Sequence, residues 1–144
     1  MGQHVLVPVD GSDRSEKALQ YALENLQDPR LTVVHVVNPA NTMGYADDEY
    51  FDFEAYQRQS ELQHERGEKL LDEARETAES RGVAVETVLE VGRPARSILE
   101  VADDRDVDHI VMGSRGRSGV GRVIFGSVAE TVTRRAGVPV TIVR

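Results

Sequence analysis

Residues 107–128 read VDHIVMGSRGRSGVGRVIFGSV, and they carry the strongest structural signal in the chain. The first six, residues 107–112, form a short apolar run that is typical of a buried strand. Five glycines then fall between residues 113 and 126, and glycine lets backbone N–H groups come close to a ligand. From Ser127 onward the sequence predicts a helix, with this serine as its N-cap.

A strand, a glycine-rich loop and a helix start, in that order, predict an anion site. The free N–H groups and the positive end of the helix dipole would point to one place. Charge agrees with this hypothesis, because the loop contains Arg115, Arg117 and Arg122, and no carboxylate occurs between Asp108 and Glu130. A surface loop that binds nothing is the alternative interpretation of the same residues.

Composition limits the class of protein. The chain has 144 residues and a formal net charge of -8, which argues against general binding to nucleic acid. It has no cysteine, so disulfides and thiolate metal sites are excluded. We expect no signal peptide, and no apolar run comes close to the ~20 residues that a membrane span needs. We therefore expect one cytoplasmic domain over residues 1–144, with neither nucleic acid nor a membrane as partner.

Apolar runs and helical patterns alternate along the chain. Buried strands are predicted at residues 5–9, 31–37, 83–91, 107–112 and 138–143. Asp13 and Glu16 match a capping box at the start of the first helix. A long helix is predicted over residues 54–81, with Gly82 as its C-cap and with Gly67 as a weak point in its middle. The buried stripe expected for this helix includes Leu62, Leu70, Leu71, Ala74 and Ala78.

Strands that alternate with helices predict an α/β fold, a doubly wound domain with a parallel sheet and helices on both faces. The third strand alternates apolar and polar residues, as an edge strand does. Ligands bind such sheets beyond the carboxyl ends of the strands, where the strand order reverses. If the first and fourth strands flank that point, Asp10 and Gly113 lie at the same crevice.

The glycine spacing resembles that of a known family. Gly113-x-x-Gly116, nine residues and then Gly126-Ser127 match the G-x2-G-x9-G-[S/T] nucleotide signature of the universal stress proteins. The likeness covers essentially the whole chain, including a first strand that ends Val-Pro-Val-Asp and a last strand that begins Val-Pro-Val. It implies a five-stranded sheet of order 3-2-1-4-5 that binds ATP, alone or with Mg²⁺.

The resemblance and the loop chemistry together give a set of candidate nucleotide-binding residues. In ATP-binding members, the matching positions line the base and ribose pocket or hold the ribose and phosphates. The candidates are Pro8, Val9, Asp10, Val36, Met112, Gly113, Arg115, Gly116, Arg117, Gly126, Ser127 and Val128. Asp10 could accept hydrogen bonds from the nucleotide or form an Asx turn with Gly11. The loop arginines could bind phosphate bidentately or be solvated.

Three functions fit these residues. The leading hypothesis is an ATP-binding stress-response or signalling module, because the sequence offers no clear general base and no Walker-type lysine for fast hydrolysis. A slow ATPase or nucleotide hydrolase, with Asp10 placing Mg²⁺ or water, is the second. The third is a dimeric scaffold that binds no nucleotide.

Two further features bear on partners and metals. Residues 138–143 form an apolar strand expected at the sheet edge, and in similar proteins this strand pairs with its copy, so a homodimer is predicted. The histidines have no metal-ligand spacing, and a lone strand histidine such as His35 is expected to be hydrogen-bonded rather than catalytic.

Overall fold

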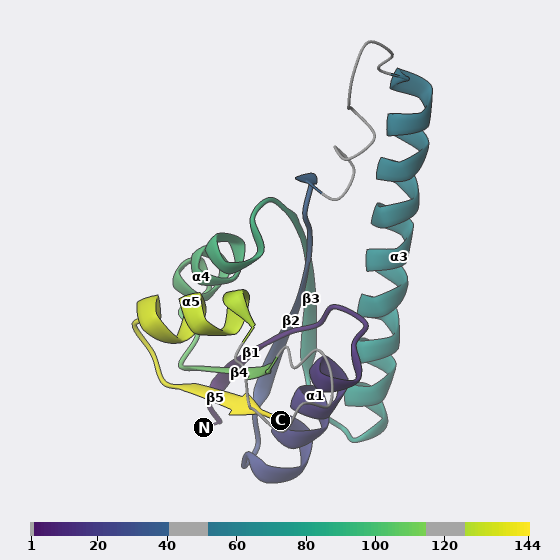
Figure 1. Ribbon diagram of the computed structural model, residues 1–144. Helices are drawn as coiled ribbons and strands as arrows, with labels where there is room; N and C mark the ends of the chain where they lie inside the picture. Colours follow the sequence, from purple (N-terminus) through teal and green to yellow (C-terminus); the bar gives the residue numbers. More distant parts are fainter. Residues whose placement is uncertain (1, 41–51, 115–125) are drawn as a thin grey trace.

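The protein is described here by a computed structural model that places residues 2–40, 52–114 and 126–144 (Figure 1). The elements, in chain order, are β1 (His4–Pro8), α1 (Asp13–Asn25), β2 (Arg30–Val37), α3 (Phe53–Ser80), β3 (Val85–Val91), α4 (Pro94–Asp104), β4 (His109–Gly113), α5 (Ser127–Arg135) and β5 (Val140–Val143). The strands form a five-stranded sheet of order β3-β2-β1-β4-β5 in which each neighbouring pair is parallel. The α/β class and the strand order 3-2-1-4-5 are confirmed.

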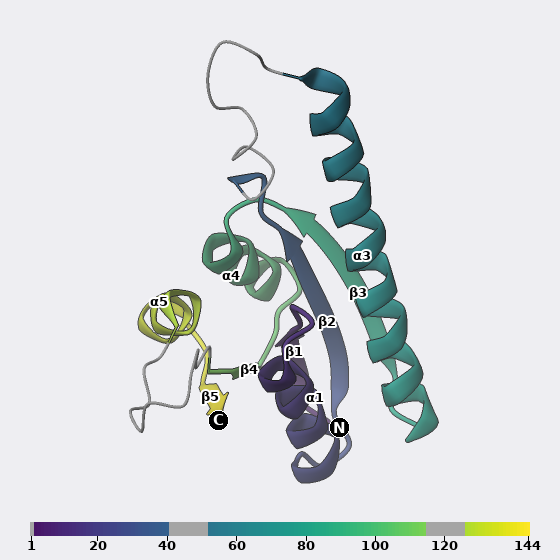
Figure 2. The same ribbon diagram turned by 45° about the vertical axis from the view of Figure 1, so that its right-hand side comes forward.

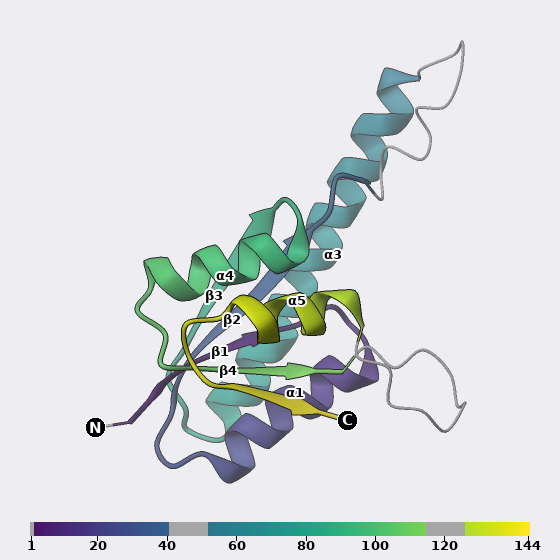
Figure 3. The same ribbon diagram turned by 60° about the vertical axis from the view of Figure 1, so that its left-hand side comes forward.

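Helices cover both faces of the sheet, because successive side chains of a strand point to opposite sides. Val5 and Val7 of β1 pack in the apolar cluster formed with α1 and α3, whereas Leu6 between them packs with α4 and α5. Figures 1 and 3 show the two helix pairs on opposite sides of the sheet. The prediction of a doubly wound sheet is therefore confirmed.

The edge strands differ from the central ones in burial. Each central strand has a run of buried residues, whereas in β3 Val88 alone is buried, as predicted for an edge. β5 forms the opposite edge, and all four of its residues are partly exposed. Pro8 ends β1, and the missing N–H of proline disturbs the hydrogen-bond ladder least at the end of a strand.

The predicted N-caps of two helices are wrong by one residue. In α1 the N-cap is Ser12, whose hydroxyl accepts the N–H of Ser15 at 3.2 Å, so Asp13 is already helical and makes no capping box. In α5 the N-cap is Gly126, and Ser127 is the first helical residue, without a side-chain capping bond. In both cases the extended backbone before the helix ends one residue earlier than side-chain preference predicts.

Helix α3 is one unbroken helix of 28 residues and is longer than the sheet that it covers. At ~1.5 Å per residue it measures about 42 Å, whereas the longest strand spans roughly 26 Å. Its first turns therefore extend beyond the sheet (Figure 2), and Leu62, predicted to be buried, is 56% exposed. Although α3 is long, neither it nor any other helix within the placed ranges is apolar enough to span a membrane.

Gly67 does not interrupt α3 but lets the helix lie close to the sheet. A Cβ atom at this position would lie 2.7 Å from Cδ2 of His35 and 2.8 Å from Cδ1 of Leu89. The buried residues of α3 are Gly67, Leu71, Ala74 and Ala78, all in its second half. Gly82 follows the C-cap Arg81 with a φ of 72°, which places glycine at the predicted end of the helix.

His4, at the start of β1, is buried in its neutral form. The Arg30 guanidinium can only donate, and its Nη2 lies 3.2 Å from Nδ1 of His4, so this nitrogen is the acceptor. The other ring nitrogen then donates to Oγ1 of Thr32 at 2.7 Å. Burial, and secondarily the positive charge of Arg30, lower the pKa of His4 below its ordinary value of 6.5.

We expect the free energy of unfolding to decrease as the pH falls below about 6.5. Below this pH the unfolded chain takes up a proton on His4, whereas the folded chain, with its lowered pKa, does not. The free energy of unfolding, measured by urea titration at several pH values, should therefore change less steeply with pH in His4→Gln than in the wild-type protein between about pH 6.5 and 5.5. The pKa of His109 is also lowered by burial, so His109→Gln should change the slope in the same direction. An unchanged slope in both variants would contradict this account.

Candidate functional site

A cavity of about 430 Å³ opens at the carboxyl ends of β1, β2 and β4. Its volume lies in the range of small-molecule pockets. β1 lies between β2 and β4 in the sheet, so the strand order reverses here, and α/β sheets bind ligands at such points. The cavity is therefore where the topology predicts a ligand site.

The cavity brings together many of the predicted site residues. Those that line it are Pro8, Val9, Asp10, Val36, Met112, Gly113 and Val128. Asp10 and Gly113 thus share one crevice, as predicted. Gly126 and Ser127 begin α5 beside Val128 but are not among its lining residues. Arg115, Gly116 and Arg117 lie outside the described residues.

One wall of the cavity is apolar and continuous with the core. Val36 of β2, Met112 of β4 and Ile98 of α4 line it and belong to the apolar cluster under α4 and α5. Val128 and Ala129 add the first turn of α5 to the same wall. A wall of this composition suits a flat aromatic ring, because burying the faces of the ring away from water is favourable and requires few hydrogen-bond partners.

The opposite side of the cavity is polar and is held by the turn between β1 and α1. Oδ1 of Asp10 accepts the N–H of Ser12 at 2.9 Å, and the N–H of Asp10 donates to Oγ of Ser15 at 3.2 Å. Asp10 therefore forms an Asx-type turn, one of the two roles considered for it. Contact between Asp10 and a ligand stays a prediction.

His35 ties β2 to the end of β1 at the floor of the cavity. Its Nδ1 lies 2.7 Å from the carbonyl oxygen of Val9, so Nδ1 carries the proton and donates. The N–H of Val9 donates to the carbonyl oxygen of Val34 at 2.8 Å, which extends the pairing of the two strands by one residue. The expectation that His35 is hydrogen-bonded is confirmed.

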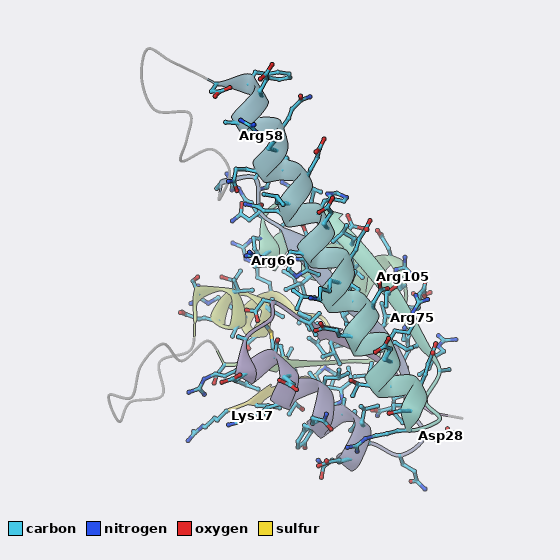
Figure 4. All side chains as sticks on the ribbon, turned by 90° about the vertical axis from the view of Figure 1, so that its right-hand side faces the viewer. Lys17, Asp28, Arg58, Arg66, Arg75 and Arg105 are labelled. Carbon is cyan, nitrogen blue, oxygen red and sulfur yellow. The ribbon has the colours of Figure 1, made fainter. Side chains whose placement is uncertain are left out.

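Several residues that line the cavity were not predicted from the sequence. Gln63, Arg66 and Leu70 lie on one face of α3, and Arg14 lies in the first turn of α1. Figure 4 shows Arg66 on the side of α3 nearer α5, opposite Arg75. Arg14 is the second residue of α1 and belongs to no motif, so the sequence does not single it out. Nothing in the sequence indicates which turn of a 28-residue helix lies over the carboxyl edge.

Titratable groups at the cavity are of both signs, and the described residues contain no cluster of three or more metal-ligating side chains. Asp10 is the carboxylate among the lining residues, and Arg14 and Arg66 are the cations. These groups are suited to hydrogen bonding and to binding an anion. They do not form a metal-binding set.

Gly113 has a packing reason to be glycine. A Cβ atom at this position would lie 2.6 Å from the backbone C and O atoms of Arg14 in α1. Real Cβ atoms do not approach backbone so closely, so any larger residue would push α1 away from the end of β4. The first glycine of the signature is therefore required by the contact between helix and strand, in addition to any role at a ligand.

We expect Gly113→Ala to lower the free energy of unfolding by about 1–3 kcal/mol, the usual cost of overpacking. Gly137→Ala is the matched control, because a Cβ atom there would have no neighbour within 4 Å. Urea titration of both variants measures the difference. Equal stability of the two variants would show that α1 shifts to accommodate the added methyl group without a loss in the free energy of unfolding.

Comparison with known proteins agrees with the fold described above. The chain matches the model of the universal stress protein family over residues 1–144. It is 37% identical over 153 aligned positions to universal stress protein YxiE of Bacillus subtilis, with 100% of each chain covered. Its fold resembles that of a universal stress protein from Archaeoglobus fulgidus, with a TM-score of 0.75, 30% identity and 100% coverage of both chains. It also resembles a universal stress protein solved in complex with cAMP, with a TM-score of 0.65, 28% identity and coverage of 99% and 97%.

Proposed function

The chain belongs to the universal stress protein family, and we propose that it binds an adenine nucleotide, ATP, in the cavity at the carboxyl ends of β1, β2 and β4. One observation carries the proposal. Asp10, Val36, Met112, Gly113 and Val128, from separate parts of the chain, converge on a single cavity with an apolar wall and a polar side. The relative solved with cAMP adds support, because its ligand is also an adenine nucleotide.

In this proposal the two sides of the cavity bind different parts of the nucleotide. The adenine ring packs on the wall that contains Val36 and Met112, and Asp10 accepts hydrogen bonds from the amino group or the ribose. The phosphates bind near Gly113 and the start of α5, where N–H groups and the helix dipole favour an anion. Arg115, Gly116, Arg117, Gly126 and Ser127 are the further proposed phosphate contacts. Mg²⁺, where present, is held by the phosphates and water.

The proposed role is that of a cytoplasmic stress-response or signalling module whose state depends on the bound nucleotide. Fast hydrolysis needs a base that orients water and a group that stabilises the transferring phosphate. Among the described residues that line the cavity, Asp10 is the carboxylate, and it already accepts the N–H of Ser12 within a turn. This arrangement favours a binding module over a hydrolase.

We expect freshly purified protein to release an adenine nucleotide on denaturation, identified by chromatography. After removal of bound nucleotide, calorimetry should show ATP binding that Asp10→Ala weakens by roughly tenfold, because a charged hydrogen-bond partner is lost. Asp13→Ala, in the first turn of α1 and outside the cavity lining, is the matched control and should bind normally.

Other outcomes of this experiment favour the alternative functions. If neither ATP nor AMP gives heat with the wild-type protein, the scaffold without nucleotide is favoured. If ATP is consumed by highly purified protein and Asp10→Ala abolishes the turnover, the slow hydrolase is favoured. Bound ATP that stays intact for hours supports the signalling module.

We also propose that the protein forms a homodimer through β5. This strand is an edge of the sheet and is shorter than predicted, four residues in place of residues 138–143. The carbonyl groups of Pro139 and Val143 accept hydrogen bonds from Ile110 and Ser114, so they face β4. Because backbone groups alternate along a strand, those of Val140 and Ile142 face the open edge and can pair with a copy.

We expect sedimentation velocity at micromolar concentration to show a dimer. Ile142→Pro removes an N–H group that faces the open edge while the bonds from β4 stay in place, so it should shift the protein to monomer. Circular dichroism checks that the variant keeps its fold. A wild-type monomer at micromolar concentration would contradict the proposal.

A further inference from the structure

We propose that Arg14 binds a phosphate group of the nucleotide and makes the cavity prefer phosphorylated ligands to the nucleoside. Arg14 lies outside the glycine signature and comes from α1, on the face of the sheet opposite α5. The inference rests on the proposed function, since it concerns the same cavity. It adds Arg14 as a residue by which the cavity distinguishes charged, phosphorylated ligands from the uncharged nucleoside.

Arg14 is held at the end of β4 by its side chain. Its Nη1 donates to Oγ of Ser114 at 3.1 Å, and Ser114 is 1% exposed. The N–H of Ser114 in turn donates to the carbonyl oxygen of Val143 at 2.8 Å. The guanidinium group is therefore fixed to the end of β4, which is itself hydrogen-bonded to β5, although it comes from a helix.

The backbone of Arg14 is held at the same place. Its C and O atoms are the ones that a Cβ atom at Gly113 would approach within 2.6 Å. Two consecutive residues at the end of β4 therefore position both ends of the arginine. Gly113 lies against its backbone, and Ser114 accepts a hydrogen bond from its guanidinium. A charged group that is ordered before the ligand arrives loses less entropy on binding.

Arg14 has donors left over for an anion. A guanidinium carries five N–H donors in a planar fork, and the bond to Ser114 uses one of them. Within the placed ranges, the ion pairs join Arg81, Arg96, Arg105 and Arg134 to glutamates, and none of them includes Arg14. The positive charge of Arg14 is therefore not neutralised by a described carboxylate, and phosphate is the group that suits such a fork.

The position of Arg14 beside Gly113 and Ser114 assigns the phosphate, and not the base, to this arginine. The apolar wall with Val36 and Met112 fits the ring, so the anionic end of an adenine nucleotide extends toward Gly113, whose backbone lies against that of Arg14. Arg66, from α3, is the other cation among the described residues that line the cavity, and the ion pairs with described carboxylates named above do not include it. Because Arg66 is not tied to the end of β4 as Arg14 is, it serves as a comparison within the same cavity.

The experiment measures the affinity of the full-length protein for two probes, ATP and adenosine, by calorimetry after bound nucleotide has been removed. We expect Arg14→Gln to weaken ATP binding by roughly tenfold or more, the effect of losing a charged hydrogen bond. Adenosine affinity should change by less than about twofold, because adenosine has no phosphate for the lost cation. The loss for ATP should shrink in high salt, which screens charge.

Three variants serve as controls. Lys17→Gln removes a charge from the same helix outside the cavity lining and should leave both affinities unchanged (Figure 4). Arg14→Lys keeps the charge without the planar fork, so it should recover part of the ATP affinity even if Arg14→Gln folds poorly. Arg66→Gln should weaken ATP binding less than Arg14→Gln does.

The outcomes separate this inference from the proposed function. Equal losses for ATP and adenosine, or no loss for either, overturn the assignment of Arg14 to phosphate while nucleotide binding stands. Equal losses in Arg14→Gln and Arg66→Gln also overturn it, because they would reflect the overall charge of the cavity. If the wild-type protein binds neither ATP nor adenosine, the proposed function fails, and this inference fails with it.

Discussion

The complete enclosure of β1 is the constraint on which the rest of the structure depends. Val5, Leu6 and Val7 have no exposed surface, because β2 and β4 pair with both edges of the strand and helices cover both of its faces. A strand enclosed in this way can offer the solvent only its ends. The turn after Pro8, which carries Asp10, is therefore the place where the central strand becomes accessible, and the cavity lies there.

Much of this arrangement could be predicted from local sequence. The apolar runs at β1 and β2 are continuous because both faces are buried, and the alternation in β3 reflects an edge with one buried valine. Alternating strands and helices restrict the topology to a parallel sheet, and the pairing of β1 with β4 in that sheet places Asp10 beside Gly113. The strand order itself came from the glycine spacing and its resemblance to a family, since periodicity alone does not order strands.

The features that could not be predicted depend on contacts between distant parts of the chain. Ser12 caps α1 in place of Asp13, because the turn formed by Asp10 already holds Ser12. Leu62 has the helical spacing of a buried residue, but the sheet does not reach that far along α3. In the sequence Arg14 is an ordinary helix residue, and only its bond to Ser114, 100 positions away, sets it apart. Local patterns predict which elements form, but not where one element ends over another.

The mismatch in length between α3 and the sheet divides this helix into two parts with different local stability. Residues 53–66 include no buried residue, whereas Gly67, Leu71, Ala74 and Ala78 pack against the sheet. Backbone amides in the first part can therefore exchange hydrogen with solvent through local fraying. Those in the second part exchange only when the core opens cooperatively. Helix α3 thus combines a first part without buried residues, which reaches beyond the sheet, with a second part that packs against it, and the boundary lies between Arg66 and Gly67.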